Sequence, residues 1–199
     1  MLFLFKHKHI TMARKLIVFN SISLDGYFSG VNGDISWAHK PGDDAEWTAF
    51  VQGNAGEGGV LVFGRVTYEM MAGYWPTPHA ASADPQLAAH MNSLQKIVFS
   101  RSLDKASWEN TKLLTNLADD VRRLKNEPGD DMVILGSGSI VSQLTQAGLI
   151  DEYQVVINPV LLGAGKTMFE GIDHAVGLKL TNSRTFKNGN VVLTYKAGK

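Results

Sequence analysis

A group of glycine and serine residues after an apolar run is the feature of this sequence with the clearest chemical meaning. The run is Met132–Leu135, and four residues follow it directly: Gly136, Ser137, Gly138 and Ser139. Glycine lets the backbone approach a ligand without a Cβ in the way. Apolar residues at helical spacing follow, and the first N–H groups of a helix favour a phosphate. A plain tight connection is the alternative, and the Rossmann spacing fails because position 141 is not glycine.

Two other strand-like runs end in residues that suit an anion. Val60–Phe63 leads into a helical pattern, and Ile97–Phe99 ends in polar residues. The residues after these two runs are Gly64, Arg65, Thr67, Ser100 and Arg101. An arginine in the first turn of a helix opposes the helix dipole, which points to a bound anion, although a solvated arginine is the alternative. Two arginines suit a monoester phosphate, whereas an acidic residue would be expected beside the ribose of NAD.

Candidates for proton transfer and for covering a flat ligand lie earlier in the chain. Asp25 and Asp44 are the candidate acids, and Asp44 is also a candidate helix cap. The irregular segment 25–37 contains Phe28 and Trp37, aromatic side chains that cover either the core or a ligand ring. The sequence has no cysteine and no evident Ser-His-Asp arrangement. Hydride transfer needs neither, because the cofactor carries the chemistry.

Short apolar runs that alternate with helical patterns must position these residues. Strands are expected at Lys15–Ser23, Val60–Phe63, Ile97–Phe99, Lys112–Leu114 and Met132–Leu135, with helices in between. After Gly148 the pattern predicts strands at Glu152–Asn158, Leu178–Phe186 and Val191–Tyr195, the last two joined by a hairpin turn. The sequence therefore predicts an α/β fold with a mixed, mostly parallel central sheet and antiparallel C-terminal strands.

Composition and charge limit the classes of function. The chain has 199 residues, of which 44% are hydrophobic and 19% charged, as in globular proteins. Residues 1–12 are expected to be an N-terminal extension and residues 13–199 a single domain. Lys+Arg and Asp+Glu number 19 each, so no basic field favours nucleic acid or a membrane. The lack of cysteine agrees with a cytoplasmic location, and no metal site is expected.

In this order, the three strand ends resemble the NADPH site of the dihydrofolate-reductase superfamily. The greatest resemblance is to the reductase domain of the bifunctional riboflavin-biosynthesis deaminase/reductase and its stand-alone relatives. Ser23–Gly26 and Asn158–Gly165 support it, the latter resembling a proline-glycine turn of that family. The similarity covers roughly residues 14–196. Each motif is short, but five in the same order are specific, and they imply a dihydrofolate-reductase-like three-layer fold.

The resemblance implies NADPH as the cofactor and assigns its phosphates. Arg65 and Thr67, next to Gly64, would hold the adenosine phosphates. Ser100 and Arg101 would bind the 2′-phosphate, which distinguishes NADPH from NADH. The backbone of residues 136–139 would bind the pyrophosphate.

The resemblance also implies where the nicotinamide and the substrate lie. Ser21 and Phe28 would contact the nicotinamide. Asp44 is similar in position to the substrate-binding carboxylate of the folate enzyme, and Trp37 would be a further substrate contact. Asp25 is the second candidate for the proton donor. The folate enzyme has an arginine before its third strand, and Gln95-Lys96 stands there instead, which argues against dihydrofolate.

These features predict an NADPH-dependent reductase of a small heterocyclic or sugar-amine substrate, such as the ribosylaminouracil phosphate of riboflavin synthesis. The alternatives are a dihydrofolate or pterin reductase and a nucleotide-binding module without catalysis. A P-loop kinase is disfavoured, because Gly163–Thr167 lacks the glycine required five residues before Gly165. A homodimer is expected from the apolar run Val160–Leu162, from the C-terminal strands and from the superfamily, whose members commonly dimerise.

Overall fold

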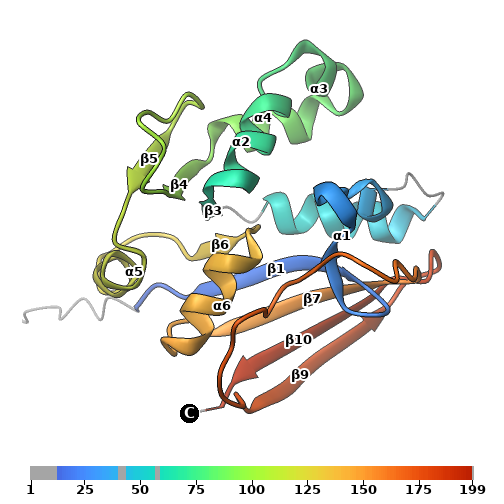
Figure 1. The fold of residues 1–199 in the computed structure, drawn as a ribbon. Coiled ribbons are helices and arrows are strands. Elements are labelled where there is room, and N and C mark those ends of the chain that lie inside the picture. The colour runs from blue at the N-terminus through green and yellow to red at the C-terminus, as the bar shows by residue number, and fades with distance from the viewer. Residues whose placement is uncertain (1–12, 40–43, 57–58, 199) are drawn as a thin grey trace, which may run out of the picture.

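The computed structural model describes residues 13–39, 44–56 and 59–198, so the predicted extension at 1–12 lies outside the described residues. An eight-stranded sheet with the order β5-β4-β3-β6-β1-β7-β10-β9 forms its centre (Figure 1). The strands are β1 (Leu16–Ser23), β3 (Val60–Gly64), β4 (Gln95–Phe99), β5 (Thr111–Leu114), β6 (Met132–Ile134), β7 (Glu152–Asn158), β9 (Leu178–Thr185) and β10 (Val191–Ala197). Neighbouring strands from β5 to β7 are parallel, whereas β10 and β9 pair antiparallel. The predicted mixed sheet is therefore confirmed.

Helices cover both faces of this sheet. The helices are α1 (Ala45–Gly56), α2 (Arg65–Tyr74), α3 (Pro78–Ala83), α4 (Pro85–Ser93), α5 (Leu117–Lys125) and α6 (Gly138–Gln146). Apolar side chains of α5 and α6 pack into the largest core cluster with the central strands. Those of α2 and α4 pack on the opposite face, over β3 and β4, and those of α1 pack over β7 and β10. The result is three layers, helices on either side of one sheet.

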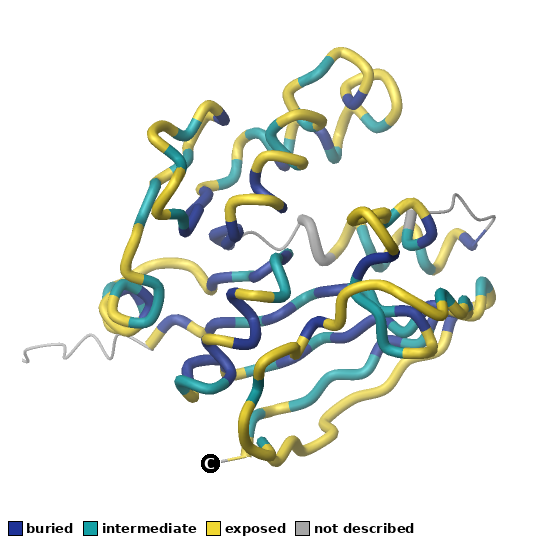
Figure 2. The backbone as a smooth tube through the Cα atoms, viewed as in Figure 1, coloured by how far each residue is buried: buried dark blue, intermediate teal, exposed yellow. Residues whose placement is uncertain are grey.

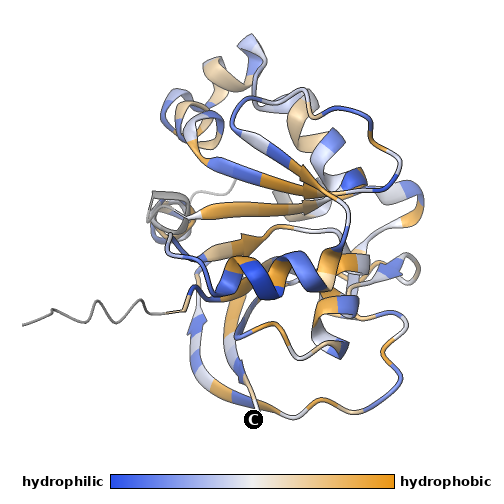
Figure 3. Cartoon of the chain, turned by 90° about the vertical axis from the view of Figure 1, so that its left-hand side faces the viewer, coloured by the Kyte–Doolittle hydropathy of each residue, from blue (hydrophilic) through white to orange (hydrophobic). Residues whose placement is uncertain are grey.

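Alternation along β3 explains how one strand serves two cores. Val60 and Val62 belong to the cluster under α5 and α6, whereas Leu61 and Phe63 belong to the cluster under α2 and α4. Successive side chains of a strand point to opposite faces, so a strand covered on both sides must be apolar throughout. The central strands are accordingly buried in Figure 2 and mainly hydrophobic in Figure 3.

A second, two-stranded sheet lies beside the first and was not predicted. It pairs β2 (Tyr27–Ser29) antiparallel with β8 (Lys166–Thr167), and two short 3₁₀ turns, Val31–Gly33 and Ser36–His39, follow β2. The segment similar to a P-loop is thus a turn and a strand, without a helix, which agrees with the rejection of a kinase. Among the helices of the described residues, none is long and apolar enough to cross a membrane.

Candidate functional site

The topology creates a crevice between β3 and β6. These strands are neighbours, but the chain leaves them in opposite directions, through α2 to β4 and through α6 to β7. At such a switch point the loops after the strands diverge, and ligands bind outside the carboxyl ends. Gly64 is the last residue of β3, Gly136 follows the end of β6 by two residues, and Gly64 N donates a hydrogen bond to Gly136 O at 3.0 Å. The two predicted glycine turns therefore meet at one edge of the sheet.

Close packing at this edge requires glycine. Gly136 has a φ of 122°, in the region that favours glycine, and the peptide bond to Ser137 is cis. A Cβ on Gly136 would lie 2.9 Å from Thr67 Oγ1 and 3.1 Å from Phe28 Cζ. A Cβ on Gly64 would collide with Ser137 Oγ. Any side chain at either glycine would fill the space in which the two turns and Phe28 meet.

Two helices begin at the crevice without side-chain caps. The N-cap residues of α2 and α6 are Gly64 and Ser137, and neither accepts a hydrogen bond from its helix through a side chain. The first N–H groups of both helices therefore lack side-chain acceptors, and the helix dipoles make this edge positive. Ser137 Oγ and Ser139 Oγ lie 2.9 Å apart beside them. Together with the two glycines, this donor set fits the diphosphate of a dinucleotide.

The two predicted arginines differ in their partners. Arg65 Nη1 lies 2.9 Å from Glu69 Oε2, four residues along α2, so binding a phosphate would exchange that partner. Arg101 is exposed, and within the described part of the chain it has no hydrogen bond or ion pair. Ser100 Oγ accepts hydrogen bonds from the N–H groups of Ser102 and Leu103, at 3.1 and 3.0 Å, which turns the chain after β4. Because β4 neighbours β3, both arginines lie at the edge that carries the glycine turns.

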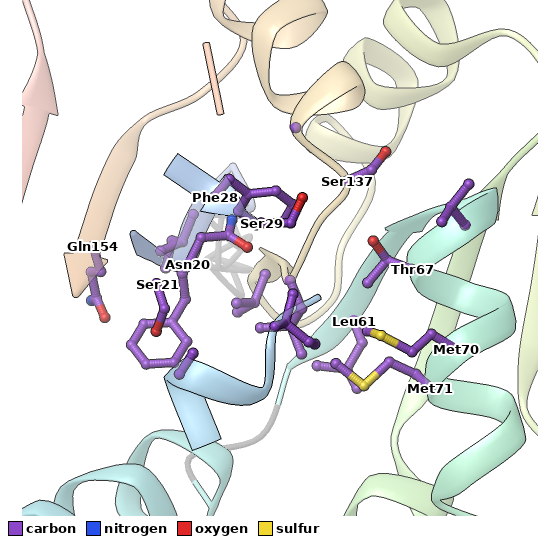
Figure 4. A pocket seen from close by; sticks show the side chains of 18 of the residues that line it. Asn20, Ser21, Phe28, Ser29, Leu61, Thr67, Met70, Met71, Ser137 and Gln154 are labelled. Atoms are coloured by element: carbon purple, nitrogen blue, oxygen red, sulfur yellow. The ribbon is translucent and has the colours of Figure 1, made fainter. Parts of the chain in front are cut away.

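A cavity of about 1000 Å³ adjoins the crevice and extends over one face of the sheet. Its floor includes Ile17 and Ser21 of β1, Leu61 of β3 and Gln154 of β7. Side chains of α2 and α4 form one wall, and Val51 of α1 also lines the cavity. Figure 4 shows Asn20, Ser21 and Gln154 on one side of this space and Leu61, Met70 and Met71 on the other. The cavity therefore joins a polar edge to an apolar wall.

The predicted site residues divide into two groups. Those that line the cavity are Ser21, Phe28, Thr67, Ser137, Gly138 and Ser139. Those outside its lining are Asp25, Trp37, Asp44, Gly64, Arg65, Ser100, Arg101 and Gly136. Trp37 is buried, and its Nε1 donates to Asp34 O at 3.1 Å, so its ring packs within its own loop. Residues predicted to contact the nicotinamide and the diphosphate thus line the cavity, whereas neither candidate acid does.

Asp44 forms the helix cap that the sequence offered as the alternative to a catalytic role. Its Oδ1 accepts hydrogen bonds from Glu46 N and Trp47 N at 3.0 and 3.1 Å, which caps α1. Its Oδ2 accepts one from Asn188 N at 3.0 Å, which joins α1 to the hairpin before β10. Burial alone would raise the pKa of this carboxyl, but the backbone N–H groups outweigh it and lower the pKa. The carboxylate is therefore ionised and directed at the backbone.

Asp25 is also bound to hydrogen-bond donors. It accepts from Ser23 Oγ at 2.6 Å and from the N–H groups of Leu162 and Gly163 at 3.1 and 2.7 Å. The Ser23 hydroxyl and then the Gly163 N–H lower the pKa of Asp25 below its usual range. A carboxylate in this state has no proton to donate near neutral pH. Asp25 instead ties the turn after β1 to the loop after β7.

Lys96, in place of the folate enzyme's arginine, is withdrawn from the cavity. The residue is 1% exposed, and its Nζ donates to Asn92 O at 3.0 Å and to Leu94 O at 2.5 Å. The ammonium lies 4.5 Å from the centre of the Trp108 ring. Burial lowers the pKa of Lys96 to about 8, although Glu109 raises it in part. This cation stabilises the end of α4 and does not face a ligand.

Among the lining residues that sequence reasoning missed are Asn20, Met70, Met71 and Gln154. Asn20 is buried, and its Nδ2 donates to Ile134 O at 3.3 Å. Polar residues inside two apolar strands were a usable signal, since a buried amide needs a partner or a ligand. The methionines gave no such signal, because their spacing on α2 is also that of ordinary core residues.

The sequence matches a family profile and a curated protein over most of its length. The profile described as the RibD C-terminal domain matches residues 14–192. The uncharacterized protein YyaP of Bacillus subtilis is 29% identical over 182 residues, which cover 92% of this chain and 94% of YyaP. The match therefore includes every strand end at the crevice.

Solved structures share the fold. A protein of Shewanella sp. PV-4 named as a candidate riboflavin biosynthesis protein aligns with a TM-score of 0.74 at 23% identity, over 93% of this chain and 99% of that one. Dihydrofolate reductase of Enterococcus faecalis, solved with NADP(H), aligns with a TM-score of 0.58 at 17% identity, over 93% and 97% of the two chains. At these identities the similarity establishes the fold alone, and it confirms the expected dihydrofolate-reductase-like fold.

Proposed function

The chain belongs to the RibD C-terminal domain family, and from this premise we propose that it is an NADPH-dependent reductase of the riboflavin-biosynthesis type. The observation that carries the proposal is the crevice between β3 and β6, where two uncapped helix starts and two glycines adjoin the cavity. When bound, NADPH would supply the hydride. The substrate would be a small heterocycle or sugar amine. The NADP(H) complex of the folate enzyme, which has the same fold, supports the choice of cofactor.

The residues at the crevice would divide the binding of NADPH among them. The N–H groups at the start of α6 and the hydroxyls of Ser137 and Ser139 would hold the diphosphate, with Thr67 opposite. Arg101 would bind the 2′-phosphate, because it is exposed beside the end of β4 and has no partner in the described part of the chain. Arg65 would join it after leaving Glu69. Ser21 and Phe28 would contact the nicotinamide at the mouth of the cavity.

The proton for the reduced atom would come from solvent. Asp25 and Asp44 are both held ionised by hydrogen bonds, and neither lines the cavity. A reductase can use an ordered water for this step, since the hydride carries the difficult part of the chemistry. The same observation favours the second candidate function, a nucleotide-binding module without catalysis. Oxidation of NADPH in the presence of pyrimidines, pterins and quinones separates the two.

Binding of the two cofactors tests the proposal. NADPH and NADH are titrated against the wild type, against Arg101→Ala and against Arg122→Ala, a control on α5 whose arginine pairs with Asp119. A hydrogen bond to a charged group contributes about 1.5–3 kcal/mol, so Arg101→Ala should weaken NADPH about tenfold or more and leave NADH unchanged. Arg122→Ala should change neither. Equal affinity of the wild type for NADPH and NADH contradicts the proposed cofactor.

A further inference from the structure

We infer that the substrate of the proposed reductase is a neutral, unphosphorylated ring with an apolar face and one polar edge. The inference rests on the proposed function and narrows its substrate class, so that the ribosylaminouracil phosphate suggested by the resemblance is excluded. It depends on the wall of the cavity built by α2, α4 and β3. We call the part lined by Leu61, Met70, Met71, Met91 and Leu94 the methionine compartment.

The methionine compartment offers a substrate dispersion contacts and no charge. Leu61 and Met91 belong to one buried cluster, and Met71 and Leu94 pack against it. Met70 is 41% exposed, so a methionine side chain remains open to a ligand. Methionine is flexible and polarizable and makes favourable contacts with aromatic rings. An apolar ring face gains free energy on leaving water for such a wall.

Basic side chains are nearly absent from the cavity. Among the lining residues that the structure describes, the sole lysine or arginine is Lys166 of β8, which pairs with Ser29 of β2. The acidic side chains of the lining are Asp130, Asp131 and Glu170. A phosphate monoester carries close to two negative charges and is normally bound by arginine or lysine. Placed in the methionine compartment it would lie unpaired against apolar side chains, which is strongly unfavourable.

Lys96 does not supply the missing charge. It follows Leu94 of the compartment by two residues, but its Nζ is bound to the carbonyl oxygens of Asn92 and Leu94 and lies over Trp108. Trp108 belongs to the core below α2 and does not line the cavity. Turning the ammonium into the cavity would break both hydrogen bonds, and the carbonyl group of the half-buried Leu94 would lose this donor.

The opposite side of the cavity provides the polar contacts. Ser21 and Gln154 lie across the space from Met70 and Met71 (Figure 4). Hydroxyl and amide groups both donate and accept hydrogen bonds, so they suit the N–H and C=O groups along one edge of a heterocycle. A ring with one polar edge against these residues would lay its apolar face on the methionines. A ribosyl phosphate extending from that ring would find no cationic partner in the compartment.

A matched pair of compounds tests the inference. A ribosylaminouracil with and without its 5′-phosphate is assayed for NADPH oxidation and, without cofactor, for quenching of tryptophan fluorescence, since Trp75 lines the cavity. The compound without phosphate should have a kcat/KM at least tenfold higher and bind at least tenfold more tightly. Equal or better binding of the phosphorylated compound overturns the inference. If NADPH is neither bound nor oxidised, the proposed function fails, and the order of affinities in the fluorescence assay still decides the substrate class.

A charge placed in the compartment provides the second test. Met70→Lys adds a cation at an exposed part of the wall, and Gly73→Lys adds the same charge on α2 at a position outside the lining with no neighbour within 4 Å. Met70→Lys should improve the affinity of the phosphorylated compound at least tenfold relative to the compound without phosphate. Gly73→Lys should leave the ratio of these two affinities unchanged. The same effect from both variants, or no effect from Met70→Lys, contradicts binding in the methionine compartment.

Discussion

At the scale of single residues, the hydrogen bonds of a carboxylate decide whether it can act as an acid. Asp25 and Asp44 are the two candidate acids that sequence reasoning selected for proton transfer. Each accepts hydrogen bonds from backbone N–H groups. Asp44 accepts from three such groups, and Asp25 accepts from two. Such bonds favour the ionised form and lower the pKa. Both carboxylates therefore stabilise turns and helix ends, and the cavity is left to neutral polar groups.

Replacing Asp44 separates the two roles. Asp44→Ala should lower the Tm by about 2–6 °C, because α1 loses its cap and Asn188 N loses its acceptor, while turnover stays within about threefold. Asp84→Ala is the control, since Asp84 caps α4 through Leu87 N at 3.0 Å and has no bond to a distant loop. The Tm of Asp84→Ala should fall by less than the Tm of Asp44→Ala. A loss of turnover of about a hundredfold at an unchanged Tm would restore a catalytic role to Asp44.

Gly136 is the residue at which the crevice is most sensitive to an added methyl group. In Gly136→Ala the Cβ would meet Thr67 Oγ1 and Phe28 Cζ at a φ that alanine rarely adopts. We expect a loss of about 1–3 kcal/mol in the free energy of unfolding and NADPH affinity at least tenfold weaker. Gly73→Ala, at an unhindered position in α2, should be neutral or stabilising by up to about 1 kcal/mol. Thermal unfolding and cofactor titration of both variants measure these effects.

At the scale of elements, the sequence was sufficient where a pattern is local. The runs ending at Gly64 and Gly136 predicted strand, turn and helix correctly, because apolar periodicity and glycine act over a few residues. The pairing of β2 with β8 was missed, since strands of three and two residues have no readable alternation. The cap formed by Asp44 was a predicted alternative, but its bond to Asn188 N was missed, because the two residues are 144 positions apart in the chain. A single sequence carries no signal for a contact between residues so far apart in the chain.

The bond between the loops after β1 and β7 makes stability depend on pH. Asp25 has a lowered pKa in the folded protein, so between that value and 3.8 the unfolded chain binds more protons than the folded one. Its contribution is complete above 3.8 and is lost as the pH falls through the lower, folded value. Asp25→Asn should therefore have a lower Tm than the wild type at about pH 7, and the difference should shrink toward about pH 3.

An exposed carboxylate provides the control for this pH dependence. Asp104 is exposed and has no hydrogen bond in the described part of the chain. Asp104→Asn should therefore follow the wild-type Tm at every pH. A difference between Asp25→Asn and the wild type that stays constant from about pH 7 to about pH 3 would contradict a role for the Asp25 charge in joining the two loops.

At the scale of the whole molecule, the cavity follows from the way the helices are distributed over the sheet. On one face, α5 and α6 cover the central strands and complete the largest core cluster. On the other face, α1 packs over β7 and β10 while α2 and α4 pack over β3 and β4. Ile17 of β1 and Val133 of β6, between these two groups of helices, consequently line the cavity. Apolar residues in central strands predict burial, but they do not reveal whether a helix or a ligand covers them.

The exposed edge of the sheet motivates the last prediction, that the protein is a homodimer. All eight residues of β9 are exposed, the strand pairs on one side only, and Leu178 and Leu180 are 42% and 50% exposed (Figure 2). An unpaired edge strand with apolar side chains is a template for association with another chain. Light scattering at micromolar concentration should give the mass of a dimer, and Leu180→Lys should give a monomer. Leu24→Lys, at a residue that is 65% exposed on the turn after β1, should remain dimeric. A monomeric wild type would refute the prediction, and a dimer unaffected by Leu180→Lys would move the interface away from β9, with the exposed Leu161 the next residue to replace.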